Sequence, residues 1–171
     1  MPEVLFVAGE ASGDLHAAGV AEELRKLRPD LELTGFGGPL MEKAGVALFD
    51  RYETGVMGFL EILKHVPRHW ELLNTVRDRF AERPVKLLIV VDYPGFNMKA
   101  AAAAKDAGVP VLYYVTPQVW AWGEGRLATL ARIVTKAAVI LPFEEALLRG
   151  HGIDASFVGH PLLDRAGNLP S

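Results

Sequence analysis

The sequence predicts an α/β fold with a doubly wound, mostly parallel sheet of the Rossmann-like kind. Strands and helices alternate about six times along the 171 residues, the order that a parallel sheet with crossover helices requires. Residues 87–91 are five consecutive aliphatic residues, a pattern typical of a strand buried on both faces of such a sheet. The length suits one domain with a real hydrophobic core.

The predicted strands are short apolar runs that stop at glycine, proline or a polar residue. In chain order they are residues 4–8, 31–36, 46–49, 87–91, 111–115, 137–141 and 156–158. The predicted helices have apolar residues at helical spacing, or are bounded by proline and glycine. In chain order they are residues 15–27, 40–44, 72–81, 96–108, 126–132 and a helix that begins at Pro142. In the helix at 72–81 we expect Arg77, Asp78 and Arg79 to be solvated.

Composition excludes several classes of protein. The chain is 50% hydrophobic and 23% charged with a formal net charge of −3, so nothing favours nucleic-acid binding, which needs a basic stripe. It has no cysteine, which rules out disulfides and thiolate metal sites, and its five histidines show no HExxH spacing. We find no secretory signal and no apolar run of roughly 20 residues, so we expect no membrane-spanning helix.

Polar residues gather where predicted strands end. In an open parallel α/β sheet, the carboxyl ends of the strands form the rim at which ligands bind. The residues that we expect at this rim are Glu10, Asp14, Asp92, Asn97, Gln118, Trp120, Trp122 and Arg126. One well-placed carboxylate there could act as a general base on a hydroxyl group.

Asp92 and the loop at 9–14 each have two interpretations. The strand at 87–91 would deliver the Asp92 carboxylate to the rim, where it could take part in chemistry. Alternatively, Asp92 caps the helix that follows, because aspartate is favoured near helix N-termini. The glycines of the loop suit close approach of a ligand or a plain strand-to-helix turn, and the loop matches neither GxGxxG nor a Walker sequence.

Residues 56–70 form an apolar arc that is wider than a helix packed on one side of a sheet requires. The apolar residues of the arc are Val56, Met57, Phe59, Leu60, Ile62, Leu63 and Val66. Cations and Trp70 follow at its far end, as in elements that lie on a membrane surface. The alternative is a core helix with a polar terminus.

Seven motifs follow one another along nearly the whole chain. They are AGEASGD (8–14), GFGGPLM (35–41), VMGFLEIL (56–63), DYPGFN (92–97), YYVTPQVWAW (113–122), LPFE (141–144) and FVGHPL (157–162). In this order and spacing they resemble the lipid-A-disaccharide synthase family. Each motif is weak alone, but together they are specific. Gly123 is a departure, because many members of the family have a basic residue at that position.

The resemblance implies an inverting, metal-independent glycosyltransferase of the GT-B fold. Such an enzyme joins UDP-2,3-diacylglucosamine to lipid X (2,3-diacylglucosamine 1-phosphate), releases UDP and forms the β-1,6 disaccharide of lipid A. By this resemblance Asp92 is the catalytic base that accepts the proton of the acceptor 6-hydroxyl. No cofactor is expected.

The rim and the resemblance together assign residues to the substrates and to a membrane. The predicted substrate-binding residues are Gly9, Glu10, Ser12, Gly13, Asp14, Asn97, Gln118, Trp120 and Arg126. The predicted membrane-docking residues are Val56, Met57, Phe59, Leu60, Leu63 and Val66. The expected location is the cytoplasmic face of the bacterial inner membrane, as a peripheral protein, and a homodimer is expected for the full-length protein.

GT-B enzymes have two Rossmann-like domains, and the second binds most of the nucleotide. We therefore expect residues 1–163 to be the acceptor-side domain and 164–171 a tail or the start of a linker, with the nucleotide-binding domain absent. The chain alone is expected to be inactive or nearly so. Two other classes stay open: a non-catalytic module that binds a lipid-sugar or a membrane surface, and another GT-B-like enzyme, such as an epimerase.

Overall fold

The computed structural model describes residues 1–52, 66–118 and 124–166. Its strands are β1 (Glu3–Ala8), β2 (Glu32–Gly37), β3 (Ala47–Arg51), β4 (Val85–Val91), β5 (Val111–Tyr114), β6 (Lys136–Val139) and β7 (Ala155–Phe157). Its helices are α1 (Ala11–Leu27), α2 (Pro39–Lys43), α4 (Val66–Glu82), α5 (Pro94–Asp106), α6 (Glu124–Ile133), α7 (Pro142–Gly150) and α8 (Pro161–Ala166). Each predicted strand is present, with its ends shifted by a few residues.

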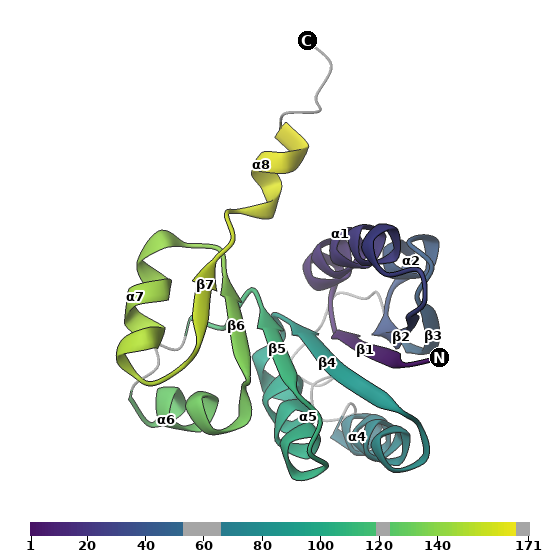
Figure 1. Cartoon of the computed structure of the whole chain (residues 1–171). Coiled ribbons are helices and arrows are strands. Elements are labelled where there is room, and N and C mark those ends of the chain that lie inside the picture. The colour runs from purple at the N-terminus through teal and green to yellow at the C-terminus, as the bar shows by residue number, and fades with distance from the viewer. Residues whose placement is uncertain (53–65, 119–123, 167–171) are drawn as a thin grey trace.

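The strands form a parallel sheet. Within the described residues their order is β3-β2-β1-β4-β5-β6-β7, and every neighbouring pair is parallel. From β1 the chain runs to one edge, returns past β1 to β4 and continues to the other edge, which is the doubly wound path. Figure 1 shows α1 and α2 on one face of the sheet, with α4 and α5 on the other. The predicted fold class is confirmed.

A hydrophobic core lies on each face of the sheet. In β1, Leu5 and Val7 belong to the core shared with α4 and α5, whereas Phe6 belongs to the core shared with α1. Successive side chains of a strand point to opposite faces, so a central strand is apolar along its whole length. Full burial of each such side chain stabilises the fold by about 1.5–3 kcal/mol. The aliphatic runs therefore become central strands, and polar residues follow them at one edge.

Two helices begin four or more residues before the start that the sequence pattern predicts. α1 begins at Ala11, so most of the predicted loop at 9–14 is its first turn. The Asp14 N–H already donates to the Glu10 carbonyl over 2.9 Å, as in an α-helix. α4 is described from Val66, inside the predicted apolar arc, rather than from 72. Apolar periodicity locates the packed part of a helix, and the polar first turn of α1 carries no such signal.

Glu3 is the centre of a buried ion-pair cluster at the amino end of the sheet. Its side chain is 0% exposed and accepts hydrogen bonds from the Thr34 hydroxyl (2.5 Å), Arg79 Nη2 (2.9 Å) and Arg83 Nε (2.5 Å). Burial alone would raise the pKa of Glu3, but these three donors outweigh burial and hold the pKa below its ordinary value. The expectation that Arg79 is solvated is wrong: its side chain is 18% exposed because it pairs with Glu3.

Candidate active site

Two segments that are distant in sequence leave the sheet side by side. β1 and β4 are parallel neighbours, and Ala8 pairs with Val91 at their carboxyl ends. The next residues, Gly9 after β1 and Asp92 after β4, therefore begin at the same level of the rim. The register of these two strands thus brings together two segments that the sequence analysis assigned separately to a site.

Glu10 and Asp92 form a carboxyl pair at this rim. Asp92 is half-buried and Glu10 is exposed, and the two carboxyl groups are close enough to interact electrostatically. Burial raises the pKa of Asp92, and the negative charge of Glu10 raises it further, against the opposing effect of the Tyr93 backbone N–H. The Ser12 hydroxyl donates to Glu10 Oε1 over 2.8 Å. Asp92 is consequently a stronger base than an ordinary aspartate, as proton abstraction near neutral pH requires.

The backbone that presents Asp92 is strained. Asp92 and Tyr93 have φ angles of 49° and 44°, in the left-handed region that residues with a side chain rarely adopt. Each such residue costs about 1–3 kcal/mol, so surrounding contacts must hold the turn. The Asp92 carbonyl accepts hydrogen bonds from Asn97 Nδ2 (2.7 Å) and the Tyr113 hydroxyl (2.8 Å). Burial, followed by the charge of Asp92, raises the pKa of Tyr113 far above its ordinary value, so the phenol stays a neutral donor.

The position of α5 bears on the alternative in which Asp92 is a helix cap. The N-cap residue of α5 is Tyr93, and Asp92 lies one residue before it. Asn97, in the first turns of the helix, is buried and donates through Nδ2 to the carbonyls of Val91 and Asp92. The Asn97 amide therefore fixes the turn through these two hydrogen bonds. A contact between Asn97 and a substrate stays a prediction.

A glycine at position 9 allows close packing at the rim. A Cβ atom on Gly9 would lie 2.2 Å from the Tyr93 ring, so only glycine lets that ring lie against the backbone. A Cβ on Gly13 would lie 3.4 Å from the Ala8 Cβ and from the Val91 carbonyl oxygen, which is close to an ordinary contact distance. Gly13 therefore lies where α1 meets the sheet.

Asp14 is engaged with the start of α2. Its side chain is buried, and its carboxylate accepts hydrogen bonds from the backbone N–H groups of Gly38 (3.1 Å), Leu40 (3.1 Å) and Met41 (2.9 Å). The Tyr52 hydroxyl is a further neighbour at 3.4 Å. These contacts use both carboxylate oxygens to fix the connection after β2. Substrate binding by Gly13 or Asp14 stays a prediction, whereas Glu10 and Ser12 are exposed at the rim.

The remaining predicted residues are only partly described. Gln118 follows β5 and Arg126 lies in α6, and both are exposed. Trp120 lies outside the described residues, and so do Val56, Met57, Phe59, Leu60 and Leu63. Val66 begins α4, and its side chain is also outside the described part of the chain. α8 runs across the predicted domain boundary at residue 163.

Two tyrosines of the site, Tyr93 and Tyr113, are not among the residues predicted from the sequence. Tyr93 is part of the DYPGFN motif beside Asp92, and this proximity was a signal that could have identified it. Tyr113 has the pattern of an ordinary strand aromatic. Only the strand order, with β5 beside β4, brings its hydroxyl group to the Asp92 carbonyl.

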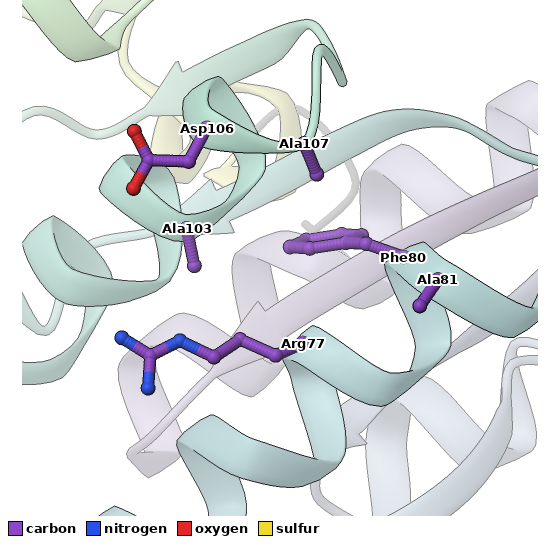
Figure 2. Close-up of a pocket in the computed structure, with 6 residues that line it drawn as sticks. All are labelled: Arg77, Phe80, Ala81, Ala103, Asp106 and Ala107. Carbon is purple, nitrogen blue, oxygen red and sulfur yellow. The ribbon is translucent and has the colours of Figure 1, made fainter.

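The structure also has hollows away from this rim. One of them has a volume of about 450 Å³. Figure 2 shows it between α4, which carries Arg77 and Phe80, and α5, which carries Ala103 and Asp106. It lies near the carboxyl ends of both helices, which in a parallel α/β fold is the edge opposite to the rim. None of the predicted site residues lines it.

Among the described residues, no cluster of three or more His, Asp or Glu side chains could hold a metal ion. None of the described helices combines the length and apolar character that crossing a bilayer requires.

Comparison with known proteins places this chain in a family. The profile of a family described as lipid-A-disaccharide synthetase matches residues 4–169. The lipid-A-disaccharide synthase of Geobacter sulfurreducens is 48% identical over 163 residues, which are 95% of this chain and 42% of that protein. The synthase of Myxococcus xanthus is 46% identical over 96% of this chain and 43% of its own length. The chain thus spans less than half the length of these curated relatives.

Solved structures share the fold at low sequence identity. The Staphylococcus aureus MnaA structure with UDP matches all of this chain and 48% of its own, with a TM-score of 0.66 at 10% identity. A putative UDP-N-acetylglucosamine 2-epimerase from Listeria monocytogenes matches 96% of this chain and 50% of its own, with a TM-score of 0.61 at 12% identity. These two similarities support the fold alone. With a family profile that matches nearly every residue, the chain belongs to the lipid-A-disaccharide synthase family.

Proposed function

We propose that this chain is the acceptor-side part of a lipid-A-disaccharide synthase. Together with a second, nucleotide-binding domain, it condenses UDP-2,3-diacylglucosamine with 2,3-diacylglucosamine 1-phosphate to give the β-1,6 disaccharide and UDP. Membership of the family supports the reaction. The observation that carries the proposal is the Asp92 carboxyl group, held at the rim with its pKa raised by burial and by Glu10.

In the proposed reaction, Asp92 is the general base. The 6-hydroxyl oxygen of the acceptor attacks the anomeric carbon of the donor, and the hydroxyl proton moves to an Asp92 carboxylate oxygen. The bond from the anomeric carbon to the UDP oxygen breaks at the same time, and UDP leaves with that electron pair. Attack opposite the leaving group inverts the configuration and gives the β linkage.

The residues around Asp92 have supporting roles in this proposal. Glu10 raises the pKa of Asp92, so the base binds the proton more readily as the acceptor oxygen loses it. Asn97 and Tyr113 hold the carbonyl of the strained turn, so that the carboxyl group keeps one direction. Gly9, Ser12, Gln118, Trp120 and Arg126 complete the proposed contacts to the sugars.

The membrane location and the oligomeric state are part of the same proposal. The acyl chains of both substrates require a protein that works at a membrane surface, and the apolar arc at 56–70 is the proposed docking segment. We propose a peripheral location on the cytoplasmic face of the inner membrane and a homodimer for the full-length protein. Flotation with liposomes tests the docking segment: the Phe59→Glu, Leu63→Glu double variant should lose binding, and unchanged binding would exclude this role.

The activity is tested in the full-length protein, in which this chain is continued to the length of its curated relatives. With both acylated substrates it should release UDP and disaccharide in equal amounts. The 171-residue chain alone should turn over slowly or not at all. Strong transferase activity of the chain alone would overturn the division into two parts. Binding of the acceptor by the full-length protein without any transfer would favour the alternative, a non-catalytic lipid-sugar module.

A further inference from the structure

A hydrogen bond joins α4 to the turn that carries Asp92. His69 Nε2 lies 2.8 Å from the Tyr93 phenolic oxygen, so the imidazole and the phenol are hydrogen-bonded partners. His69 belongs to the first turns of α4, and Tyr93 is the N-cap residue of α5. The bond therefore connects two helices of one face directly beside the rim.

The Tyr93 ring is half-buried and packs against its neighbours. It lies against the Gly9 backbone, where no Cβ atom would fit. The rings of His69 and Phe96 are stacked with centroids 5.8 Å apart, and their centroids lie 6.1 Å and 6.5 Å from that of Tyr93. Burial, with a further contribution from the charge of Glu10, raises the pKa of Tyr93, so its phenol stays neutral. His69 is the hydrogen-bonded partner of this neutral phenol.

The position of the Tyr93 side chain is coupled to that of the Asp92 carboxyl group. The two residues are consecutive, and both have left-handed backbone. The main chain of the turn is held at the Asp92 carbonyl by Asn97 and Tyr113. The side chain of Tyr93 is the second anchor, and a shift of the ring would rotate the peptide unit that follows Asp92.

We propose that His69 is a positioning residue for Asp92 and that it acts through Tyr93. His69 fixes the phenol, the phenol fixes the strained turn, and the turn aims the carboxyl group at the acceptor hydroxyl. This inference rests on the proposed function, because it requires Asp92 to be the base. Misplacement of a reacting group by about 1 Å can lower a rate a hundredfold, so a residue that does not touch the substrate can still control turnover.

The test uses variants of the full-length protein that remove the hydrogen bond and keep the rings. His69→Phe retains a ring to stack on Phe96, and Tyr93→Phe retains the ring against Gly9. Each should lower kcat by about 10- to 100-fold with KM changed less than about threefold. The double variant should be no slower than the slower single variant, because both remove the same bond.

A matched control removes another hydrogen bond from the same helix. Thr75→Val deletes the exposed hydroxyl bond to the Glu71 carbonyl and should leave kcat within about twofold. Effects of the two ring variants that multiply in the double variant would overturn the proposal, and so would a kcat within about twofold of wild type for either variant. If His69→Phe does not fold, the test rests on Tyr93→Phe, which must show the expected loss of kcat of about 10- to 100-fold.

The Asp92→Asn background separates positioning from a structural role. If His69 acts only through the base, His69→Phe should change the residual rate of Asp92→Asn by less than about twofold. A further loss equal to that seen in the wild-type background would mean that the histidine supports the fold, and the positioning role would be wrong. If Asp92→Asn itself keeps the full rate, the proposed function fails. If Asp92→Asn is slow but both ring variants are fast, only the positioning role fails.

Discussion

Each end of the sheet has a carboxyl group that is at least partly buried, and the surroundings of the two groups shift their pKa values in opposite directions. At the amino end, Glu3 is surrounded by one hydroxyl group and two guanidinium groups, and its pKa is lowered despite burial. At the carboxyl end, Asp92 shares its surroundings with a second carboxyl group, and its pKa is raised. Glu3 is satisfied as an anion, whereas Asp92 is held in a setting that favours a proton.

The difference separates a stabilising site from a reactive one. Glu3 ties β1 and β2 to α4, and each of its hydrogen bonds is made in the folded state. Asp92 combines charge repulsion with left-handed backbone, and both features oppose folding. Such unfavourable features cluster at functional sites because the rest of the fold can offset them.

The largest expected effect comes from removing the base. In the full-length protein, Asp92→Asn should lower kcat by about 10²–10⁴-fold, the usual contribution of a general base. Its free energy of unfolding at neutral pH should not fall, because the repulsion with Glu10 is removed. Steady-state transfer assays and urea unfolding measure the two quantities. Asp106→Asn, at the exposed end of α5, is the matched control, and a loss below about tenfold for Asp92→Asn would return this residue to a structural role.

Glu3→Gln should give the opposite result, a loss of stability. It leaves two arginines without their buried partner, and breaking such a pair costs about 3–5 kcal/mol. Urea unfolding of the 171-residue chain measures this cost. Glu32→Gln removes only the exposed partner of Arg83 and should cost less than about 1 kcal/mol. Equal effects of the two variants would contradict the buried cluster.

The pH dependence of stability should separate the same two carboxyl groups. Because the folded-state pKa of Glu3 is lowered, its stabilisation is fully present above the unfolded-state pKa and is lost as the pH falls through the folded-state pKa. The difference in unfolding free energy between wild type and Glu3→Gln should therefore shrink in acid. The pKa of Asp92 is raised, so the pH dependence is reversed. Protonation of Asp92 favours the folded state, and this stabilisation is fully present below the unfolded-state pKa and is lost as the pH rises through the folded-state pKa. An unchanged difference between pH 7 and acid would argue against the Glu3 cluster.

Gly9→Ala should disturb the rim through packing rather than charge. Its methyl group would meet the Tyr93 ring, and overpacking of this kind costs about 1–3 kcal/mol. The transfer activity of the full-length variant should fall together with its stability, because the Tyr93 ring adjoins the turn that carries Asp92. Gly19→Ala is the control within α1: it meets no atom within 4 Å and should stabilise the helix by about 0.5–1 kcal/mol. A Gly9→Ala variant as stable as Gly19→Ala would contradict the packing of Tyr93 on Gly9.

The smallest expected effect is a shift of the pH profile. Glu10→Gln removes the negative charge beside Asp92 but leaves its burial, so the pKa of Asp92 should fall part of the way towards its ordinary value. The rate of the full-length protein declines in acid as the base becomes protonated, and in this variant the acid limb of kcat/KM should move to lower pH. A shift to higher pH, or none, would show that Glu10 does not raise the pKa of Asp92.

The sequence predicts the sheet well because the central strands β1 and β4 contain continuous apolar runs. The run at 87–91 identifies both β4 and the residue that β4 delivers to the rim. Asp92 could therefore be named from one segment. The carboxyl pair could not, because it depends on the pairing of β1 with β4, and no local pattern contains that pairing.

Partners of charged residues were the least predictable part. Arg79 has the sequence context of a solvated helix face, yet it forms an ion pair with Glu3, 76 residues earlier in the chain. Asp14 was expected at a ligand, which stays a prediction, and no sequence pattern indicated that its oxygens accept hydrogen bonds from the N–H groups at the start of α2. In each case the partner is a residue or a backbone group that only the folded chain brings near. The left-handed turn was equally hidden, because neither Asp92 nor Tyr93 is a glycine.

The register of β1 and β4 has a consequence for the order of folding. Ala8 meets Val91 only after the chain has closed a long loop that contains α1, β2, α2, β3 and α4. Contacts of such high sequence separation form slowly, because the entropy of loop closure is lost before the contact stabilises the chain. A partly folded chain therefore carries Asp92 without Glu10 beside it, as an ordinary aspartate. The raised pKa of Asp92 arises with native strand pairing, and titration of this one carboxyl group would report when the two strands have joined.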